Sequence, residues 1–167
     1  MAAADFDGNG TPDLVWENVS SSQYAIGAVT VHYYSYSPSN GPVYTGWNWL
    51  NETPTSGWVV VGAADMNHDG VPDLIWQNAS GSQYPIGAVT VNYYGGTGGA
   101  SYEGWNWLNQ TGKSGWSVRA VADQNSSGEP DLIWQEAASP FTVTVYYYTR
   151  GCIYAYDSLA RLSSANC

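Results

Sequence analysis

An acidic loop of one design occurs three times along the chain, and its side chains are those that bind a hard cation. Oxygen-bearing side chains recur at loop positions 1, 3, 5 and 9, and glycine stands at position 6, where the backbone must turn sharply. Position 7 would add a backbone carbonyl. The spacing predicts up to three Ca²⁺ sites, formed by Asp5, Asp7, Asn9, Thr11 and Asp13, by Asp65, Asn67, Asp69, Val71 and Asp73, and by Asp123, Asn125, Ser127, Glu129 and Asp131.

Ordinary β-turns are the alternative interpretation of these loops, because Asn, Asp and Gly also dominate turns that bind no metal. Turn chemistry does not require the aspartate at position 9, however, since that residue already belongs to the following strand. Eight aspartates among the fourteen acidic residues lie in the loops, and clustered carboxylates repel one another without a cation. The third loop has two aspartates where each of the others has three, so we expect it to be the weakest site.

The segment after each loop predicts a β-strand and excludes an EF-hand. An EF-hand places a glutamate at position 12, whereas Trp16, Trp76 and Trp134 stand there. Proline at position 8 followed by Asp-Leu-Val-Trp or Asp-Leu-Ile-Trp favours a strand.

The loops belong to a repeat of about 60 residues, which we divide at 1–64, 65–122 and 123–167. In the first copy four β segments are expected after the loop, at Leu14–Glu17, Ala28–Tyr34, Tyr44–Leu50 and Trp58–Gly62. Four antiparallel strands per repeat describe a propeller blade. The fold class predicted is all-β, with about 2.7 propeller-type blades, the third of them truncated.

The loop and the strand after it resemble the calcium motif of FG-GAP/VCBS-type repeats, which form integrin-like propellers and occur in extracellular bacterial and fungal proteins. The chain departs from that family in lacking a literal Phe-Gly or Gly-Ala-Pro at the expected places. The resemblance implies that Asp5, Asp7, Asn9 and Asp13, with their counterparts, are metal ligands. At the other end, the segment 154–162 is similar to the Tyr-Asp repeat of Rhs-type shell proteins, with Ala160 in place of the usual glycine. A terminal strand with a short tail is its alternative.

Fewer than three full blades cannot close a ring alone, so the repeat count predicts open β edges and self-association. We expect strand exchange, in which Ala2–Ala4 completes the third sheet of a neighbouring chain. Two chains would then close a six-blade ring, and a rotation that fails to close would build a filament. The Met-Ala-Ala-Ala start aligns with the middle of the repeat, so the chain looks like a mature or excised piece of something longer.

Composition restricts the partners. A net charge of −10 with four basic residues argues against nucleic acid and anionic membranes, and no apolar run is long enough for membrane insertion. We expect an extracellular or cell-surface protein, because modest-affinity calcium loops suit millimolar calcium. Sequons at Asn18, Asn51, Asn78 and Asn109 are candidate N-glycosylation sites. Cys152 and Cys167 could form one disulfide or could equally stay free.

Aromatic residues form a second set of candidate binding residues. Trp and Tyr rings stack on the apolar faces of sugars, and residues two apart in a strand share a face. The candidates for glycan binding are Trp47 with Trp49, Trp105 with Trp107, Tyr34 and Tyr94. Packing of the tryptophan pairs between blades is the alternative, and the one that we favour.

Catalysis finds no support in the sequence, because His32 and His68 are isolated and no nucleophile-base or carboxylate pair can be defended. The first hypothesis is a non-enzymatic, extracellular module for adhesion or for glycan or protein binding. The second is a structural subunit that assembles edge to edge into a ring or an extracellular filament. The third is a fragment of a Rhs-type shell protein.

Overall fold

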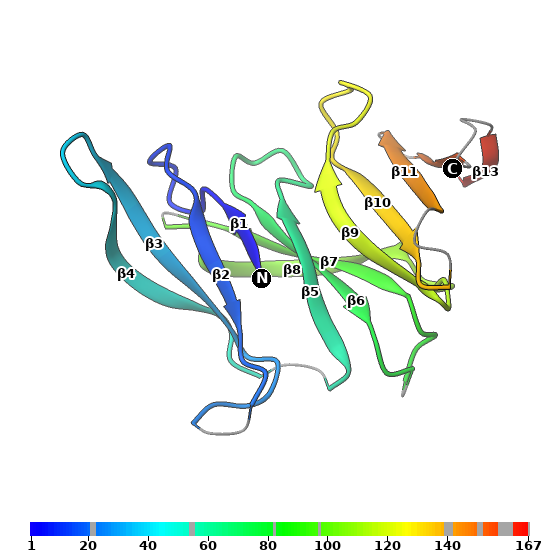
Figure 1. Cartoon of the computed structure of the whole chain (residues 1–167), viewed down its shortest axis with the longest axis horizontal. Helices are drawn as coiled ribbons and strands as arrows, with labels where there is room; N and C mark the ends of the chain where they lie inside the picture. Colours follow the sequence, from blue (N-terminus) through cyan, green and yellow to red (C-terminus); the bar gives the residue numbers. More distant parts are fainter. Residues whose placement is uncertain are drawn as a thin grey trace.

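Three antiparallel sheets, placed side by side, make up the chain (Figure 1). The computed structural model describes residues 1–20, 23–53, 56–81, 83–96, 98–138, 142–149, 152–156 and 162–166. The first sheet contains β1 (Ala2–Ala4), β2 (Asp13–Glu17), β3 (Val29–Ser37) and β4 (Gly41–Asn51). The second contains β5 (Trp58–Ala64), β6 (Asp73–Asn78), β7 (Val89–Gly95) and β8 (Ser101–Asn109). The third contains β9 (Trp116–Ala122), β10 (Asp131–Glu136), β11 (Val143–Thr149), β12 (Cys152–Tyr156) and β13 (Leu162–Asn166). The prediction of an all-β fold built from blade-like antiparallel sheets is confirmed.

Sheets and sequence repeats are out of phase by one strand. Each sheet begins with the strand before a loop, so β5 pairs with β6 and β9 pairs with β10 across their loops. The segment starting at Trp58, expected as the fourth strand of the first repeat, therefore opens the second sheet. For the same reason the third sheet needs no strand after the third repeat: it holds five strands, with β9 at one edge.

Ala2–Ala4, the segment expected to cross to a neighbouring chain, lies within the first sheet of its own chain, and its exchange between chains stays a prediction. This segment is β1, and it pairs with β2 of its own sheet in the register Ala2 to Val15 and Ala4 to Asp13. The hairpin forms because the first loop returns the chain directly beside β1, so the local pairing closes the shortest loop.

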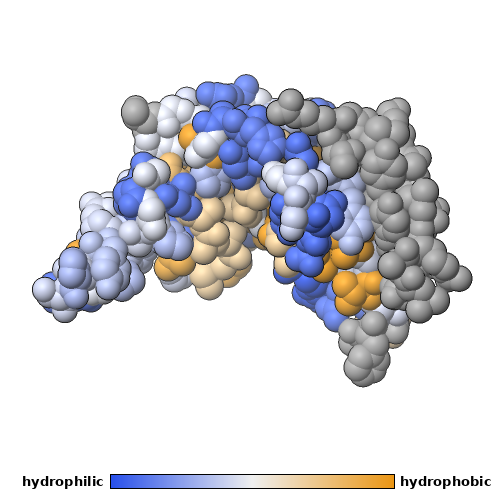
Figure 2. Space-filling model, turned by 90° about the horizontal axis from the view of Figure 1, so that it is seen from above, coloured by the Kyte–Doolittle hydropathy of each residue, from blue (hydrophilic) through white to orange (hydrophobic). Residues whose placement is uncertain are grey.

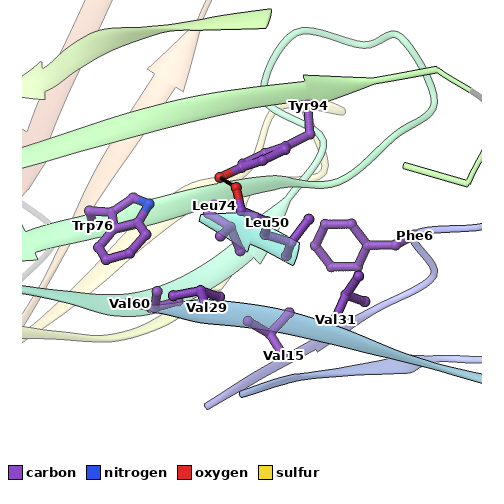
Figure 3. Packing of buried hydrophobic residues seen from close by; sticks show 9 residues of the cluster. All are labelled: Phe6, Val15, Val29, Val31, Leu50, Val60, Leu74, Trp76 and Tyr94. Carbon is purple, nitrogen blue, oxygen red and sulfur yellow. Dashed lines mark hydrogen bonds between the residues drawn. The ribbon is translucent and has the colours of Figure 1, made fainter. Parts of the chain in front are cut away.

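Alternation along the strands gives each sheet two apolar faces, and neighbouring sheets bury them against each other. Between the first and second sheets lie nine side chains, drawn in Figure 3: Phe6, Val15, Val29, Val31, Leu50, Val60, Leu74, Trp76 and Tyr94. Between the second and third sheets lie the corresponding residues one repeat later, Ile75, Val89, Val91, Leu108, Val118, Leu132, Trp134 and Tyr148. Full burial of such a side chain contributes about 1.5–3 kcal/mol, so these two interfaces hold the sheets together.

In the first and second sheets, a side chain of the second strand also hydrogen-bonds to the first strand of the following sheet. Glu17 accepts a hydrogen bond from the N–H of Val60 (3.3 Å). Gln77, one repeat later, accepts from the N–H of Val118 (3.2 Å) and donates to the carbonyl of Trp116 (3.0 Å). The N–H groups of Val60 and Val118 both lie beside a register shift in the first strand, where the ladder leaves backbone groups unpaired.

The first strands of the sheets meet along the inner side of an arch. β1 contacts β5, and β5 contacts β9. Alanine occurs in all three strands. A Cβ added to Gly62 would lie 2.4 Å from the side chain of Val121, so the contact between β5 and β9 requires glycine at position 62. Figure 2 shows the arch from above, with its concave side open. No helix among the described residues has the length and apolar character needed to cross a membrane.

Candidate metal loops and aromatic clefts

The three acidic loops leave the sheets at one edge, the upper one in Figure 1, each between the first and second strands of its sheet. In every loop the aspartate at position 1 folds the turn. Asp5 accepts hydrogen bonds from the N–H groups of Asn9 (3.1 Å) and Gly10 (2.7 Å). Asp65 and Asp123 accept the equivalent pairs. The glycine at position 6 has φ of 84 to 88° in all three loops, the left-handed region that glycine adopts without a steric cost.

The aspartate at position 9 joins each loop to its sheet through two hydrogen bonds. Asp13 is fully buried, and its two oxygens accept from the N–H groups of Phe6 (2.8 Å) and Tyr34 (2.9 Å). The same two bonds recur one repeat later at Asp73, and again at Asp131. These three aspartates therefore act as buried hydrogen-bond hubs as well as candidate ligands.

Burial outweighs those hydrogen bonds in setting the acidity of the three hubs. Desolvation raises the pKa of Asp13 and Asp131, and it raises the pKa of Asp73 to about 6. Neighbouring loop carboxylates push in the same direction, Asp7 on Asp13 and Asp69 with Asp65 on Asp73. A cation at the loop would offset both effects, because it favours the ionised carboxylate.

The first loop brings three carboxylates to a spacing that suits a metal ion. One oxygen each of Asp5, Asp7 and Asp13 lies within 4.8 Å of the others. Calcium sits about 2.4 Å from each oxygen ligand, so oxygens of one coordination shell are separated by up to about 5 Å. The donor set is all oxygen, which suits a hard cation and not zinc. Across the residues that the structure describes, no other group of three His, Cys, Asp or Glu side chains is this close.

The other predicted ligands are placed differently in each loop. Asn9 directs its Nδ2 to Asp7 Oδ2 (2.9 Å) and to the carbonyl of Tyr34 (2.8 Å), so it lies within the first cluster. In the second loop Asn67 Nδ2 donates to Asp69 Oδ2 (3.0 Å). At position 7, Thr11 is buried and Val71 packs against the first core cluster.

In the third loop the side chain of Glu129, at position 7, is directed away from its own loop. It lies 2.7 Å from Nε2 of His68, which is position 4 of the second loop. Asn125 and Ser127 cap the turn, accepting from the N–H groups of Ser127 (2.9 Å) and Glu129 (3.2 Å), as positions 3 and 5 do in the other two loops. The third loop thus has only Asp123 and Asp131 as aspartates, and a cross-link to the second loop.

Two aromatic clefts occupy equivalent places in the first and second sheets. We call the cleft of the second sheet, about 360 Å³, the inter-sheet cleft, because Asn51 at the end of β4 joins its wall. Its lining is Asn51, Trp58, Trp76, Gln83, Tyr84, Thr90, Asn92, Tyr102, Trp105 and Trp107, and none of these residues is charged. The outer cleft, about 420 Å³, lies on the first sheet and is lined by Trp16, Glu17, Asn18, Tyr24, Ala28, Thr30, His32, Trp47 and Trp49.

The predicted tryptophan pairs face these clefts and stay outside both core clusters. Trp105 is 53% exposed, and its ring meets Trp107 edge to face at 5.5 Å between centroids. Trp107 in turn contacts Tyr84 at 5.0 Å, as Trp49 contacts Tyr24 at 4.9 Å. Packing between blades, the interpretation that we favoured for these pairs, accordingly does not describe Trp47 and Trp105, which are about half exposed.

The prediction that Tyr94 contacts a glycan is wrong, because the residue is fully buried and its hydroxyl donates to the carbonyl of Leu50 at 3.0 Å (Figure 3). Tyr34 is half-buried and meets Tyr44 edge to face. Trp58, Tyr84 and Tyr102 also line the inter-sheet cleft, although they were not predicted as binding residues. The recurrence of Tyr24 as Tyr84 in the repeat alignment could have identified one of them.

Two of the candidate glycosylation sites anchor loops. Nδ2 of Asn78, a buried residue, donates to the carbonyls of Tyr84 (2.7 Å) and Pro85 (3.4 Å), so the prediction of a glycan there is wrong. Nδ2 of Asn18 makes the same pair of bonds in the first repeat. Asn51 and Asn109 are half-buried and stay predictions. The side chains of Cys152 and Cys167, and much of the segment behind the Rhs-type resemblance, lie outside the described residues.

Comparison with known proteins bears on the first two loops. No curated protein and no solved structure matched the chain. A family model did match, from Asp5 at position 1 of the first loop to Trp76 at position 12 of the second. That stretch spans both loops and the strands between them, so residues 5–76 are similar to an FG-GAP-like repeat.

Proposed function

We propose that this chain is an extracellular, calcium-stabilised, propeller-type module without catalytic activity, which serves adhesion by holding uncharged glycans in its aromatic clefts. The observation that carries the proposal is the lining of the inter-sheet cleft, where six aromatic residues face four uncharged polar ones: Asn51, Gln83, Thr90 and Asn92. The FG-GAP-like repeat supports a propeller-type module, since such repeats are typically structural and extracellular.

The cleft has the chemistry that a neutral sugar requires. Indole and phenol rings can cover the C–H faces of a pyranose, while amide and hydroxyl groups orient its hydroxyls. Trp105 and Trp107 stand nearly perpendicular, at 83°, so they offer two walls to a ligand. A phosphorylated or acidic ligand would meet no cationic partner among the lining residues.

Calcium is proposed to supply stability to this module. Asp5, Asp7 and Asp13, with Asn9, would hold the ion at the first loop, which we expect to be the strongest site. The second loop would bind more weakly, because its carboxylates are not grouped as closely, and the third most weakly, because it has two aspartates where each of the others has three. A bound cation removes carboxylate repulsion and favours the folded loop by mass action. Millimolar calcium outside cells suits sites of this kind.

A glycan array probed in calcium tests the proposal. We expect binding to neutral glycans, and Trp105→Ala should weaken it about tenfold, the loss of roughly 1.4 kcal/mol of ring stacking. Trp105 is half exposed and outside the core, so the variant should melt like the wild type. Tyr36→Ala is the matched control, because Tyr36 is exposed and lines neither cleft. Absence of glycan binding, or equal affinity of all three proteins, would rule out the glycan role.

A further inference from the structure

The floor of the inter-sheet cleft holds a buried hydroxyl that is not hydrogen-bonded. Thr90 belongs to β7, an inner strand of the second sheet, and is only 8% exposed. It lines the cleft, and among the residues that the structure describes its hydroxyl has no hydrogen-bond partner. An unpaired buried hydroxyl is unfavourable and uncommon in folded proteins. A ligand group that pairs with Thr90 would therefore gain affinity from this contact.

The strands beside β7 place one indole on each side of this hydroxyl. Thr90 pairs with Trp76 of β6 and with Trp107 of β8, and directly opposite residues of antiparallel strands point to the same face of the sheet. The Cβ atoms of such pairs are about 5 Å apart, so both indoles begin close to Thr90. A sugar ring that lies flat on the indoles is held away from the floor. A slender arm of the ligand, inserted between them, reaches it.

A second polar side chain of the floor lies two residues further along β7. Asn92 shares the face of Thr90 and is about 7 Å away along the strand. In the third sheet the equivalent residue is Tyr146, whose ring meets that of Trp134, the counterpart of Trp76, at 5.4 Å. Asn92 is shorter than a tyrosine, and Trp76 lines the cleft. We therefore expect the size of this residue to control access to the polar floor.

We propose that the inter-sheet cleft selects hexoses by their exocyclic hydroxymethyl group, which inserts between the two indoles and hydrogen-bonds to Thr90. This group extends one carbon beyond the sugar ring, and its hydroxyl can donate and accept, as the threonine hydroxyl can. Asn92 then binds a hydroxyl of the ring itself, while Trp105 covers a C–H face. The inference rests on the proposed glycan binding and adds the part of the glycan that is recognised.

Pairs of sugars that differ only in this arm test the inference. Methyl hexosides of the gluco, galacto and manno series are each compared with their 6-deoxy analogues, in which a methyl group replaces the hydroxymethyl group. Tryptophan fluorescence titration in calcium measures the affinities. In the series that binds, the hexoside should bind about tenfold more tightly than its 6-deoxy analogue, because the analogue leaves the Thr90 hydroxyl unpaired.

Thr90→Val removes the hydroxyl and keeps the shape of the side chain. The variant should bind a hexoside and its 6-deoxy analogue equally, and in urea it should be at least as stable as the wild type, because the hydroxyl that it loses is unpaired. Thr45→Val is the matched control, since Thr45 is an exposed strand residue that lines neither cleft, and it should keep the preference. Asn92→Tyr introduces the residue of the third sheet and should abolish binding of both sugars.

The inference and the proposed function fail in different ways. A wild type that binds a hexoside and its 6-deoxy analogue equally, or that binds no hexoside, overturns the role of the hydroxymethyl group. Glycan binding as such is decided by the array, whose result does not depend on this preference. A Thr90→Val variant that keeps the preference also overturns the inference. A Thr90→Val variant that loses stability shows that the hydroxyl serves the fold.

Discussion

Replacing Asp13 by alanine would separate the hydrogen-bonding role of the loop carboxylates from their metal-binding role. Asp13 is buried and accepts from the N–H groups of Phe6 and Tyr34, so its loss leaves two donors unpaired. One unsatisfied buried donor costs about 1–3 kcal/mol, and two therefore cost about 4 kcal/mol. Removing a carboxylate whose pKa is raised by burial returns part of this, so we expect a net loss of about 3 kcal/mol.

Asp7→Ala is the matched control, because Asp7 belongs to the same carboxylate group but is exposed. The hydrogen bonds that Asp7 accepts come from Asn9 within the loop, so its loss in chelator should cost less than about 1 kcal/mol. In calcium both variants should lose the stabilisation by the ion, which is about 2.7 kcal/mol when calcium is at 100 times its dissociation constant.

Urea unfolding followed by tryptophan fluorescence, in calcium and in chelator, measures these losses. In chelator the free energy of unfolding of the Asp13→Ala protein should be about 2–3 kcal/mol lower than that of the Asp7→Ala protein. Equal stability of the two variants in chelator would refute the hydrogen-bonding role. A wild type that is equally stable in calcium and chelator would refute the metal role.

Two further substitutions test contacts between the first and second sheets. Glu17→Gln places at position 17 the residue type that occurs naturally at the equivalent Gln77. Burial raises the pKa of Glu17 above its value in the unfolded chain, so the folded wild type loses stability as pH rises through that pKa and the carboxylate ionises. The variant should therefore match the wild type in acid and exceed it at neutral pH in thermal melts, and an unchanged difference across pH would contradict this. Gly99→Ala would place its Cβ 2.0 Å from the carbonyl oxygen of Phe6, whereas Gly98→Ala, also at positive φ, meets nothing within 4 Å. By urea unfolding the first should cost at least about 2 kcal/mol more than the second, and equal costs would show that Gly99 does not lie against the Phe6 carbonyl.

Local chemistry made the loops and strands predictable. The positive φ at position 6, the strand after each position-9 aspartate and the alternation of Val29 and Val31 all follow from neighbours in the sequence. The number of sheets was predictable from the number of repeats, because each loop recurs together with the strands that follow it. These features need no knowledge of distant contacts.

The position-9 aspartates illustrate what the sequence hides. Their spacing indicates a ligand, but their second role depends on the N–H of Tyr34, which lies 21 residues away and reaches Asp13 only once β3 pairs with β2. Burial of Tyr94 and Asn78 depends in the same way on loops and sheets that pack over them. Residue type alone placed both at the surface.

The sequence by itself determined that this chain is a row of β repeats with an oxygen-lined loop in each, because spacing, turn residues and alternation act over a few residues. Only the tertiary structure decided which strands share a sheet, which aromatic rings line a cleft and which remain at an open end. Equivalent residues such as Trp16 and Trp76 are identical in type, and their exposure differs solely because a sheet covers one and not the other.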